Sequence, residues 1–382
     1  MRIGIDARYL SHGIIGGVHA YVAFLISALI EAAPQDEFFL YADVKDEFEL
    51  TDLPDNVTVR LLPYRNKFSS FINDLRRLRE TMAQDNLDIA HFPANYGFGP
   101  DNARTIVTLH DHINVMPLPE IWRGHPKKAG TLTMMTYLHL VSRRAAYSSD
   151  LLITDSTYSK KQILKYINRD PDDIVVWTFG PAPDLKEVTD PDILADVRQR
   201  FNLTKPFVIA DGIKNPGALV EAWKLLSPEL RDRYQIVFFS RRPTPPDPVG
   251  EAVNLGYAQL FVRPSNEDLH ALYSMAYALA FPSFYEGLGL PLLEAMNFGT
   301  PVIASDRGSI PEVVGDAGLI FHLEDPRQFA DHLTRVLSDP AEHERLKQLG
   351  YARATQFTWD RTADAYLGFY RQVLEARTPA GV

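Results

Sequence analysis

One strand–loop–helix–strand pattern most constrains what this chain can fold into. Residues 277–281 form a short apolar run, which is typical of a buried strand. A loop over 283–289 follows, and Pro291 then suits the first turn of a helix, because its fixed φ matches the helical value. Gly299 is placed to end that helix, and residues 301–304 form a second apolar run. Two buried strands joined through a helix predict an α/β fold with a parallel sheet.

Two glutamates lie in this pattern, Glu286 in the loop and Glu294 in the helix. At this spacing two glutamates are commonly solvated and unrelated. Glu286, however, stands between an aromatic pair at 284–285 and two glycines, Gly287 and Gly289, which let backbone N–H groups approach a ligand closely. Ligands of open α/β sheets bind at the carboxyl ends of strands, and a helix N-terminus there favours an anion such as a diphosphate.

Length and composition exclude several classes of protein. The 382 residues suffice for two domains. The absence of cysteine excludes a disulfide framework and cysteine-based zinc sites, and a net charge of −10 argues against general nucleic-acid binding. No apolar run approaches the roughly 18 residues of a membrane span. A strand begins directly after Met1, so we expect no signal peptide and a cytoplasmic location.

Apolar runs of strand length recur along the whole chain and alternate with helical patterns, which indicates parallel sheets with helices on their faces. The expected strands are 3–7, 38–42, 57–62, 87–92, 104–109, 151–155, 174–178, 206–211, 235–240, 259–262, 277–281, 301–304 and 319–322. A stiff segment rich in proline, Gly180-Pro-Ala-Pro-Asp, separates two halves of this series.

A glycine pair, Gly16-Gly17, stands between the first strand and an amphipathic helix. A strand, a glycine pair and a helix N-terminus can cradle a phosphate. The pair can also be a plain tight turn, and the dinucleotide fingerprint G-x-G-x-x-G is absent from this place in the sequence. The residues alone leave both interpretations open.

Two short sequences could be taken for metal sites. His110-Asp-His112 follows the strand over 104–109, but the sequence presents no third ligand, and a single histidine at a strand end is commonly structural. Asp190-Pro-Asp192 lies among helix and linker signals rather than at a strand end, so we interpret it as a solvated linker. We therefore expect no required metal.

Residues 65–82 combine an apolar stripe with basic residues, which is unusual in an acidic chain. One interpretation is a helix packed on the core with a solvated charged face. The other is an amphipathic patch that contacts anionic lipid headgroups. The stripe consists of Phe68, Phe71, Ile72, Leu75, Leu78 and Met82, and the basic residues are Arg65, Lys67, Arg76, Arg77 and Arg79.

Three segments together resemble the carboxyl-terminal signature of glycosyltransferase family 4. They are Phe281-Pro-Ser-Phe-Tyr-Glu-Gly-Leu-Gly-Leu-Pro-Leu-Leu-Glu-Ala-Met, Gly299-Thr-Pro-Val-Ile-Ala-Ser and Ile310-Pro-Glu-Val-Val-Gly-Asp-Ala-Gly. The resemblance implies the α/β GT-B fold, in which two Rossmann-like parallel-sheet domains face each other across a cleft. It implies an acceptor-binding domain over 1–182, a nucleotide-sugar-binding domain over 183–357, and a helix over 358–382 that packs back on the first domain.

The same resemblance implies roles for individual residues. Glu294 would hydrogen-bond the ribose hydroxyls, because a carboxylate can accept from both hydroxyls of a vicinal diol. His110 would reach the transferred sugar. Glu286 would orient that sugar together with the backbone of the following residues, Gly287, Leu288, Gly289 and Leu290. The amides of Gly16 and Gly17 would face the donor diphosphate.

The chain departs from the family pattern in its phosphate loop. Lys214 and Asn215 match the family, but Ile213 stands where a second basic residue, an arginine, is usual. One lysine grips a diphosphate less well than a lysine and an arginine fork. Arg241 and Arg242 follow the next strand, so we infer that one of them supplies the missing charge. Another residue, Arg263, borders the expected position of the nucleotide base and is a weak candidate for contacting it.

The resemblance implies a retaining hexosyltransferase that moves a sugar from a UDP- or GDP-sugar to a hydroxyl of a glycan, a lipid-linked glycan or a small molecule. We expect no cofactor, no nucleic-acid partner, and a contact with the inner face of the membrane if 65–82 binds lipid. Three alternatives stay open: a nucleotide-sugar enzyme of the same fold with another reaction, a non-catalytic nucleotide-sugar-binding scaffold, and a peripheral membrane protein whose basic helix is the main function.

Overall fold

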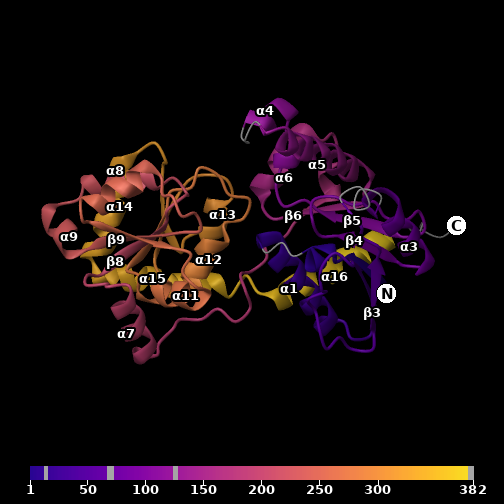
Figure 1. Ribbon diagram of the computed structural model, residues 1–382, viewed down its shortest axis with the longest axis horizontal. Coiled ribbons are helices and arrows are strands. Elements are labelled where there is room, and N and C mark those ends of the chain that lie inside the picture. Colours follow the sequence, from indigo (N-terminus) through magenta and orange to yellow (C-terminus); the bar gives the residue numbers. More distant parts are fainter. Residues whose placement is uncertain (13–15, 67–72, 124–127, 377–382) are drawn as a thin grey trace. The chain divides into compact units, whose positions relative to one another are not determined.

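The computed structural model describes residues 1–12, 16–66, 73–123 and 128–376. The chain forms two compact units (Figure 1). The first unit contains Met1–Ala182 and Trp359–Val382, and the second contains Pro183–Thr358. Within the described ranges, no helix has both the length and the apolar character needed to cross a membrane.

A sheet of seven parallel strands forms the centre of the first unit, in the order β3-β2-β1-β4-β5-β6-β7 (Figure 1). Ile3 in β1 aligns with Phe38 in β2 on one side and with Ile89 in β4 on the other. Strands β4 and β6 are buried along their whole length, as expected when helices cover both faces of a parallel sheet. The strands are β1 Arg2–Asp6, β2 Glu37–Asp43, β3 Val57–Leu62, β4 Ile89–Phe92, β5 Arg104–Thr108, β6 Leu151–Thr154 and β7 Ile174–Val176.

Helices connect these strands and cover the sheet. The longer helices are α1 Gly17–Ala32, α3 Leu78–Gln84, α4 Leu118–Arg123, α5 Ala129–Ser148, α6 Thr157–Tyr166 and α16 Trp359–Glu375. The short helices are η1 Arg8–Ser11, the π-helix η2 Asn73–Arg77, η3 Ile113–Val115 and η4 Pro171–Asp173.

Helix α16 belongs to the first unit, where it packs on α1. Three polar contacts fix it there. The Trp359 indole donates to the Pro181 carbonyl at 2.7 Å, and the Tyr366 hydroxyl lies 2.7 Å from the Tyr21 hydroxyl on α1. Tyr370 Oη lies 2.8 Å from Nδ1 of the buried His91 in β4, the strand beside β1. The helix is therefore tied to both the sheet and its neighbouring helix.

The described part of segment 65–82 packs on the core. Leu78 and Met82 are fully buried in the apolar cluster of the first unit. The basic residues Arg76 and Arg79 form ion pairs with the carboxylates of Glu80 and Asp101 respectively. Four members of the stripe and the basic cluster lie outside the described residues. They are Lys67, Phe68, Phe71 and Ile72.

A second parallel sheet, of six strands, forms the centre of the second unit. Its order is β10-β9-β8-β11-β12-β13. The strands are β8 Phe207–Asp211, β9 Gln235–Ser240, β10 Ala258–Val262, β11 Ala278–Phe281, β12 Val302–Ser305 and β13 Gly318–Phe321. The helices are α7 Pro191–Arg200, α8 Pro216–Lys224, α9 Pro228–Arg233, α10 Asp247–Asn254, α11 Asn266–Met275, α12 Leu290–Asn297, α13 Ile310–Val314, α14 Pro326–Ser338 and α15 Pro340–Ala354.

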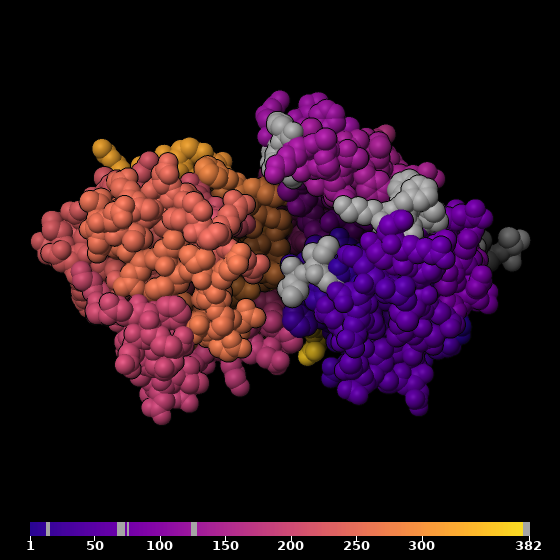
Figure 2. All heavy atoms as spheres, in the orientation of Figure 1, coloured from indigo at the N-terminus to yellow at the C-terminus, as the bar shows by residue number. Residues whose placement is uncertain are grey.

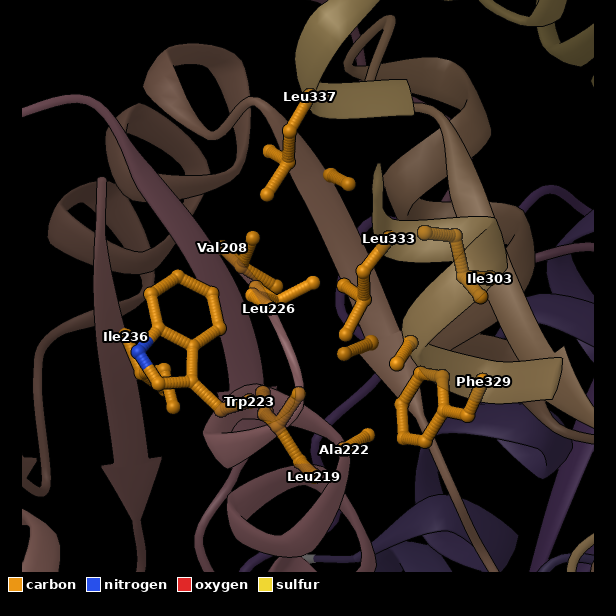
Figure 3. Close-up of a cluster of buried hydrophobic side chains, with 14 of the residues drawn as sticks. Val208, Leu219, Ala222, Trp223, Leu226, Ile236, Ile303, Phe329, Leu333 and Leu337 are labelled. Carbon is orange, nitrogen blue, oxygen red and sulfur yellow. The ribbon is translucent and has the colours of Figure 1, made fainter. Parts of the chain in front are cut away.

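The core of the second unit lies between this sheet and helices α8 and α14. Figure 3 shows Trp223 from α8 and Leu333 from α14 on either side of Val208, which lies on the central strand β8. All three side chains are fully buried, and Leu226, just after α8, joins them. Burial of apolar area at about 25 cal/mol per Å² makes such a cluster the main stabilising contribution to the unit.

In each sheet the strand order reverses beside the first strand of the unit. β1 is flanked by β2 and β4, and β8 is flanked by β9 and β11. From the two flanking strands the chain continues outward in opposite directions. Doubly wound sheets bind ligands at the carboxyl edge of the sheet where the strand order reverses in this way. The loops after β8, β9 and β11 therefore lie at the edge of the second unit where a ligand is expected.

A pair of adjacent leucines tests how far the second unit depends on this core. Leu226 is 3% exposed and Leu225 is 54% exposed. Leu226→Ala should lower the free energy of unfolding of the second unit by about 2–5 kcal/mol, because it leaves a cavity beside Trp223. Leu225→Ala should change it by no more than about 0.5 kcal/mol. Urea unfolding followed by tryptophan fluorescence measures both, and equal effects would contradict the packing described.

Candidate active site

Glu286 is held by residues from the ends of two neighbouring strands. β8 and β11 pair directly, so the loops that follow them meet at one edge of the sheet. Lys214 Nζ, from the loop after β8, donates to Glu286 Oε1 at 2.8 Å. Ser283 Oγ, just after β11, donates to the same oxygen at 2.7 Å. No described residue donates to the other carboxylate oxygen of Glu286, so this oxygen is free to accept from a ligand hydroxyl.

The loop after Glu286 turns directly into helix α12. Gly289 adopts a φ of +91°, a left-handed conformation that favours glycine, and α12 begins at the next residue, Leu290. Pro291 lies in the first turn, as the sequence predicted, and Leu288 is buried beneath the loop. The backbone between Glu286 and α12 thus follows a tight path at the carboxyl edge of the sheet.

A third strand end supports the backbone of this loop. Ser309, in the turn between β12 and α13, donates through Oγ to the carbonyls of Glu286 at 3.1 Å and Leu288 at 3.0 Å. Gly308 has a φ of +59°, and a Cβ there would lie only 2.6 Å from the Glu286 carbonyl oxygen. Gly308 is therefore required both for its own conformation and for the close approach of the Glu286 loop.

Glu294 lies one helical turn into α12 and keeps part of its surface exposed. Burial raises the pKa of Glu294 to about 6, although the positive charge of Arg241 acts in the opposite direction. Its side-chain oxygens accept no hydrogen bond from the residues that the structure describes. A carboxylate in such a setting gains from ligand hydroxyls that donate to it, which is the role expected of Glu294 toward a ribose.

The basic residues after β9 and β10 differ in their relation to the site. Arg241 is close enough for its charge to affect the pKa values of Glu294 and Asp211. Among the described residues, the side chain of Arg242 has no polar partner; its backbone N–H donates to Ser240 Oγ at 3.0 Å. Arg263 donates through Nε to the Arg241 carbonyl at 3.1 Å. Of the two arginines, Arg241 is the one whose charge acts on the carboxylates of the site.

Asp211 ends strand β8 and lies among the charged groups of the site. Its Oδ1 accepts from the Ile213 backbone N–H at 2.8 Å. Burial and the negative charge of Glu286 raise the pKa of Asp211, whereas its bond to Ile213 and the cations Lys214 and Arg241 lower it, and the net shift is upward. The carboxyl edge of the second sheet therefore combines three carboxylates with two cations.

In the first unit, Gly16 and Gly17 stand at the N-terminus of α1. Gly16 has an extended backbone, so neither strain nor a left-handed turn explains this glycine. Apart from its chain neighbours, a Cβ built on either residue would meet no atom of the described residues within 4 Å. The described structure around the pair thus gives no packing reason for two glycines. A ligand that must approach the backbone closely would supply one.

His110 follows β5 and has both ring nitrogens next to acceptors of the first unit. Nδ1 lies 3.0 Å from the Asp155 carboxylate, and Nε2 lies 3.0 Å from the Pro93 carbonyl oxygen. Burial lowers the pKa of His110, but the charge and hydrogen bond of Asp155 and the bond to Pro93 outweigh it, so the pKa is raised. Both ring nitrogens are engaged, and the His110 backbone N–H donates to Asn95 Oδ1 at 2.9 Å. That leaves the carbon edge of the ring and the backbone carbonyl to face a ligand.

The sequences considered as metal sites have other partners. Asp190 is the N-cap of α7, where its carboxylate accepts from the Asp192 backbone N–H at 2.9 Å. His112 is buried and stacks on Tyr166 with ring centroids 6.2 Å apart. Within the described ranges, no three His, Cys, Asp or Glu side chains are arranged to hold a metal ion.

Sequence reasoning missed several residues that shape the site. Asp211 is the last residue of β8, and Ser283, Gly308 and Ser309 follow the carboxyl ends of β11 and β12. The sequence therefore contained a signal, common to these four residues, that could have identified them. Polar or glycine residues directly after each predicted strand of an α/β sheet are site candidates, whether or not they belong to a known motif.

Comparisons with known proteins agree with this architecture. Residues 15–181 match the model of Glycosyltransferase Family 4, and residues 211–353 match that of Glycosyl transferases group 1. The O-antigen chain mannosyltransferase B of Escherichia coli is 30% identical over 325 residues, which cover 82% of this chain and 83% of that protein. The chain therefore belongs to glycosyltransferase family 4.

Solved structures show the same fold. Sucrose-phosphate synthase from Thermosynechococcus elongatus superposes with a TM-score of 0.69 at 21% identity, covering 98% of this chain and 99% of that structure. The Anabaena protein HepE, solved in complex with UDP-glucose, gives a TM-score of 0.64 at 16% identity, covering 96% and 99%. These matches confirm the GT-B fold class and its two parallel-sheet α/β domains.

The raised pKa of Glu294 predicts how nucleotide binding depends on pH. The ribose hydroxyls expected at this site would donate to the ionised carboxylate, and Glu294 becomes protonated as the pH falls through about 6. Affinity should then fall by up to about tenfold per pH unit below that value. Titration calorimetry between about pH 5 and pH 7 measures this. Glu294→Gln should bind more weakly and with less pH dependence, and an identical pH profile in both proteins would contradict the assignment.

The contact between Gly308 and Glu286 predicts a loss of activity without loss of the fold. Gly308→Ala forces the Glu286 loop to shift, and displacements near 1 Å can lower turnover by about 10²-fold. Gly250→Ala is the matched control, because a Cβ on Gly250 in α10 meets nothing within 4 Å. Turnover and circular dichroism of both variants test this. Full activity of Gly308→Ala would show that the loop tolerates the displacement.

Proposed function

We propose that this glycosyltransferase moves a hexosyl residue, with retention of anomeric configuration, from a UDP- or GDP-sugar to a hydroxyl of a glycan acceptor. The single observation that carries this proposal is the Lys214–Glu286 pair at the joint end of β8 and β11, beside Glu294 and Arg241. It supplies a cation for a diphosphate, a carboxylate for sugar hydroxyls and a carboxylate for a ribose on one sheet edge.

Departure of the nucleoside diphosphate is the step that these residues would assist. Negative charge grows on the diphosphate oxygen as its bond to the anomeric carbon breaks, and stabilising such charge is usually the largest catalytic contribution. Lys214 and Arg241 would supply positive charge, and the amides of Gly16, Gly17 and the start of α12 would donate hydrogen bonds. Because protein cations would fill this role, we propose a reaction that needs no metal; its rate should be unchanged by a chelator.

Glu286 would orient the donor sugar rather than attack it. Its Oε1 is engaged by Lys214 and Ser283, which reduces its nucleophilicity, and its free oxygen can accept from a sugar hydroxyl. The acceptor hydroxyl would attack the face that the diphosphate leaves, and its proton would pass to the departing diphosphate oxygen. In the first unit, His110 would contact the sugar through its backbone or ring edge.

The relatives favour particular candidates for the donor sugar and for the acceptor. The Escherichia coli relative is an O-antigen chain mannosyltransferase, which favours a mannosyl donor and a growing polysaccharide chain as acceptor. The Anabaena structure contains UDP-glucose, so the uridine series belongs in the same test. We propose that the acceptor chain is carried on a lipid, which would bring the enzyme to the inner face of the membrane.

Thermal shift with nucleotides is the experiment that tests the donor class. Ligand at about 100 times its Kd should stabilise the protein by about 2.7 kcal/mol, which is several degrees at roughly 2–4 °C per kcal/mol. UDP, GDP, ADP and their sugar conjugates are compared, and Glu294→Ala should abolish the shift. If none of them shifts the melting temperature, the nucleotide site proposed here is wrong.

Turnover of Glu286→Gln tests the catalytic role. The variant should lose at least about 10²-fold in kcat while still binding the nucleotide, because the orienting carboxylate acts on the sugar. Glu251→Gln is the matched control: Glu251 forms an equally short 2.8 Å pair with Lys224, on an exposed surface of the same unit. Mass spectrometry after quenching should show no glycosyl-enzyme adduct, and an adduct on Glu286 would refute same-face attack.

One observation favours a second function, a non-catalytic nucleotide-sugar-binding scaffold. Ile213 stands beside Lys214, so the loop after β8 offers one cation where the family has two. Slow hydrolysis of the donor in the absence of acceptor distinguishes the two functions. A transferase should release the nucleoside diphosphate at a rate that falls in Glu286→Gln, whereas a scaffold should release none.

A further inference from the structure

Tyr273, on helix α11 of the second unit, has a buried hydroxyl that the site described above does not use. Figure 2 shows the closely packed atoms at the surface of the second unit, but Tyr273 lies beneath such a surface and is only 1% exposed. Its hydroxyl has no hydrogen-bond partner among the residues that the structure describes. Buried polar groups are nearly always hydrogen-bonded, because an unpaired one loses the hydrogen bonds that water would supply. This hydroxyl therefore requires a reason.

The ring of Tyr273 is fixed by two phenylalanines from the elements that build the candidate site. It stacks on Phe298, the residue directly after α12, with ring centroids 5.7 Å apart and an angle of 1° between the planes. It also meets Phe239 edge-on at 6.0 Å, and Phe239 of β9 aligns with Asp211 at the end of β8. The Tyr273 carbonyl accepts from Thr300 Oγ1 at 2.6 Å. Both the ring and the backbone of Tyr273 are thus held in place.

These contacts place the Tyr273 hydroxyl near the charged groups of the site. The Phe298 backbone N–H donates to the Glu294 carbonyl at 3.1 Å, so the ring that stacks on Tyr273 lies one helical turn from Glu294. Burial raises the pKa of Tyr273, and the negative charges of Glu294 and Asp211 raise it further, whereas Arg241 lowers it. Because the effect of a charge weakens with distance, all three groups lie near the hydroxyl.

Glu294 is the acceptor that this donor fits best. Within the described ranges, no residue donates a hydrogen bond to the Glu294 carboxylate, whereas Asp211 Oδ1 already accepts from the Ile213 N–H at 2.8 Å. A carboxylate has lone pairs for about four hydrogen bonds, more than the two hydroxyls of a ribose can supply. A phenol O–H that donates to a carboxylate forms a bond of the strong, charge-assisted kind. A donor without an acceptor thus lies near an acceptor without a donor.

We propose that Tyr273 is a positioning residue for Glu294: its hydroxyl donates to one carboxylate oxygen of Glu294 when nucleotide binds, and the other oxygen then faces the ribose. The Tyr273 ring is fixed, so the flexible Glu294 side chain turns toward it. The hydroxyl gains its partner only in the nucleotide complex, and it adds to the affinity without touching the ligand. The proposal deepens the proposed function and rests on it, because the ribose belongs to the proposed donor.

Titration calorimetry of Tyr273→Phe tests the proposal with UDP or GDP, whichever stabilises the unaltered protein more. The change removes the hydroxyl and keeps the ring with its aromatic contacts. The Kd should rise by about tenfold, because a hydrogen bond to a charged group is lost from the complex alone. An unchanged Kd would overturn the proposal.

A double-mutant cycle shows whether Tyr273 acts through Glu294. Glu294→Gln removes the charge that the hydroxyl would stabilise, so in this background Tyr273→Phe should raise the Kd by less than about threefold. In an Asp211→Asn background the same change should still raise the Kd by about tenfold. The proposal fails if Tyr273→Phe has the same effect with and without the Glu294 charge, or if its effect depends on Asp211 instead.

The melting temperature without nucleotide separates a positioning role from a structural one. The Tyr273 hydroxyl has no described partner, so Tyr273→Phe should leave the melting temperature unchanged or raise it. Tyr234→Phe is the contrasting variant, because the Tyr234 hydroxyl donates to the Leu337 carbonyl at 2.9 Å. It should melt at a lower temperature and bind nucleotide like the unaltered protein. If Tyr273→Phe melts as low as Tyr234→Phe, the hydroxyl is structural and the proposal is wrong.

Tyr257→Phe is the matched control for affinity. The Tyr257 hydroxyl is also buried and has no hydrogen-bond partner in the described part of the chain, but Tyr257 precedes β10 at the amino edge of the sheet. Its removal should leave the Kd unchanged, and a tenfold rise would show that the Tyr273 effect is not specific. Failure of the unaltered protein to bind UDP or GDP contradicts both this proposal and the proposed function. Binding that Tyr273→Phe leaves unchanged contradicts the positioning role alone.

Discussion

The parallel pairing of β8 with β11 is the interaction on which the candidate site depends. It places side by side two strand ends that are far apart in the sequence, so that Lys214 meets Glu286 across 72 positions. β12 pairs on the other side of β11 and brings Ser309 beneath the same loop. The three loops are therefore positioned by the rigid core of the second unit, where Val208 and Ile303 are fully buried. A site built this way keeps its geometry as long as the sheet keeps its register.

The proposed diphosphate ligand would meet charges of both signs at this edge. Asp211, Glu286 and Glu294 are the carboxylates near Lys214 and Arg241, and burial makes ionisation of Glu294 less favourable than that of an exposed glutamate. A diphosphate that approached these side chains alone would meet as much repulsion as attraction. Backbone N–H groups at the start of α12 add attraction without adding a mobile charge, which is why the tight turn at Gly289 matters as much as the lysine.

The sequence supported prediction of the fold class and of most elements, because buried strands and their flanking turns leave strong local patterns. The strand over 57–62 and the end of α12 at Asn297 lie where the sequence placed them. Contacts between distant loops were beyond sequence reasoning, since they depend on strand order. The support of Glu286 by Ser309 is one example, and the effect of the Arg241 charge on Glu294 is another. The polar partners of the His110 ring, the Asp155 carboxylate and the Pro93 carbonyl, could likewise be known only from the structure.

The chain leaves the first unit at Ala182 and returns to it at Trp359. A ribosome therefore completes the whole second unit before it makes α16, whose Tyr366 and Tyr370 partner Tyr21 and His91. During that interval α1 of the growing first unit is uncovered, and Tyr21 and His91 lack the hydroxyl partners that α16 supplies. The second unit, by contrast, already has its full set of contacts. The part of the molecule that is translated first is thus the part that is completed last, and the nascent chain carries an unfinished amino-terminal unit until late in synthesis.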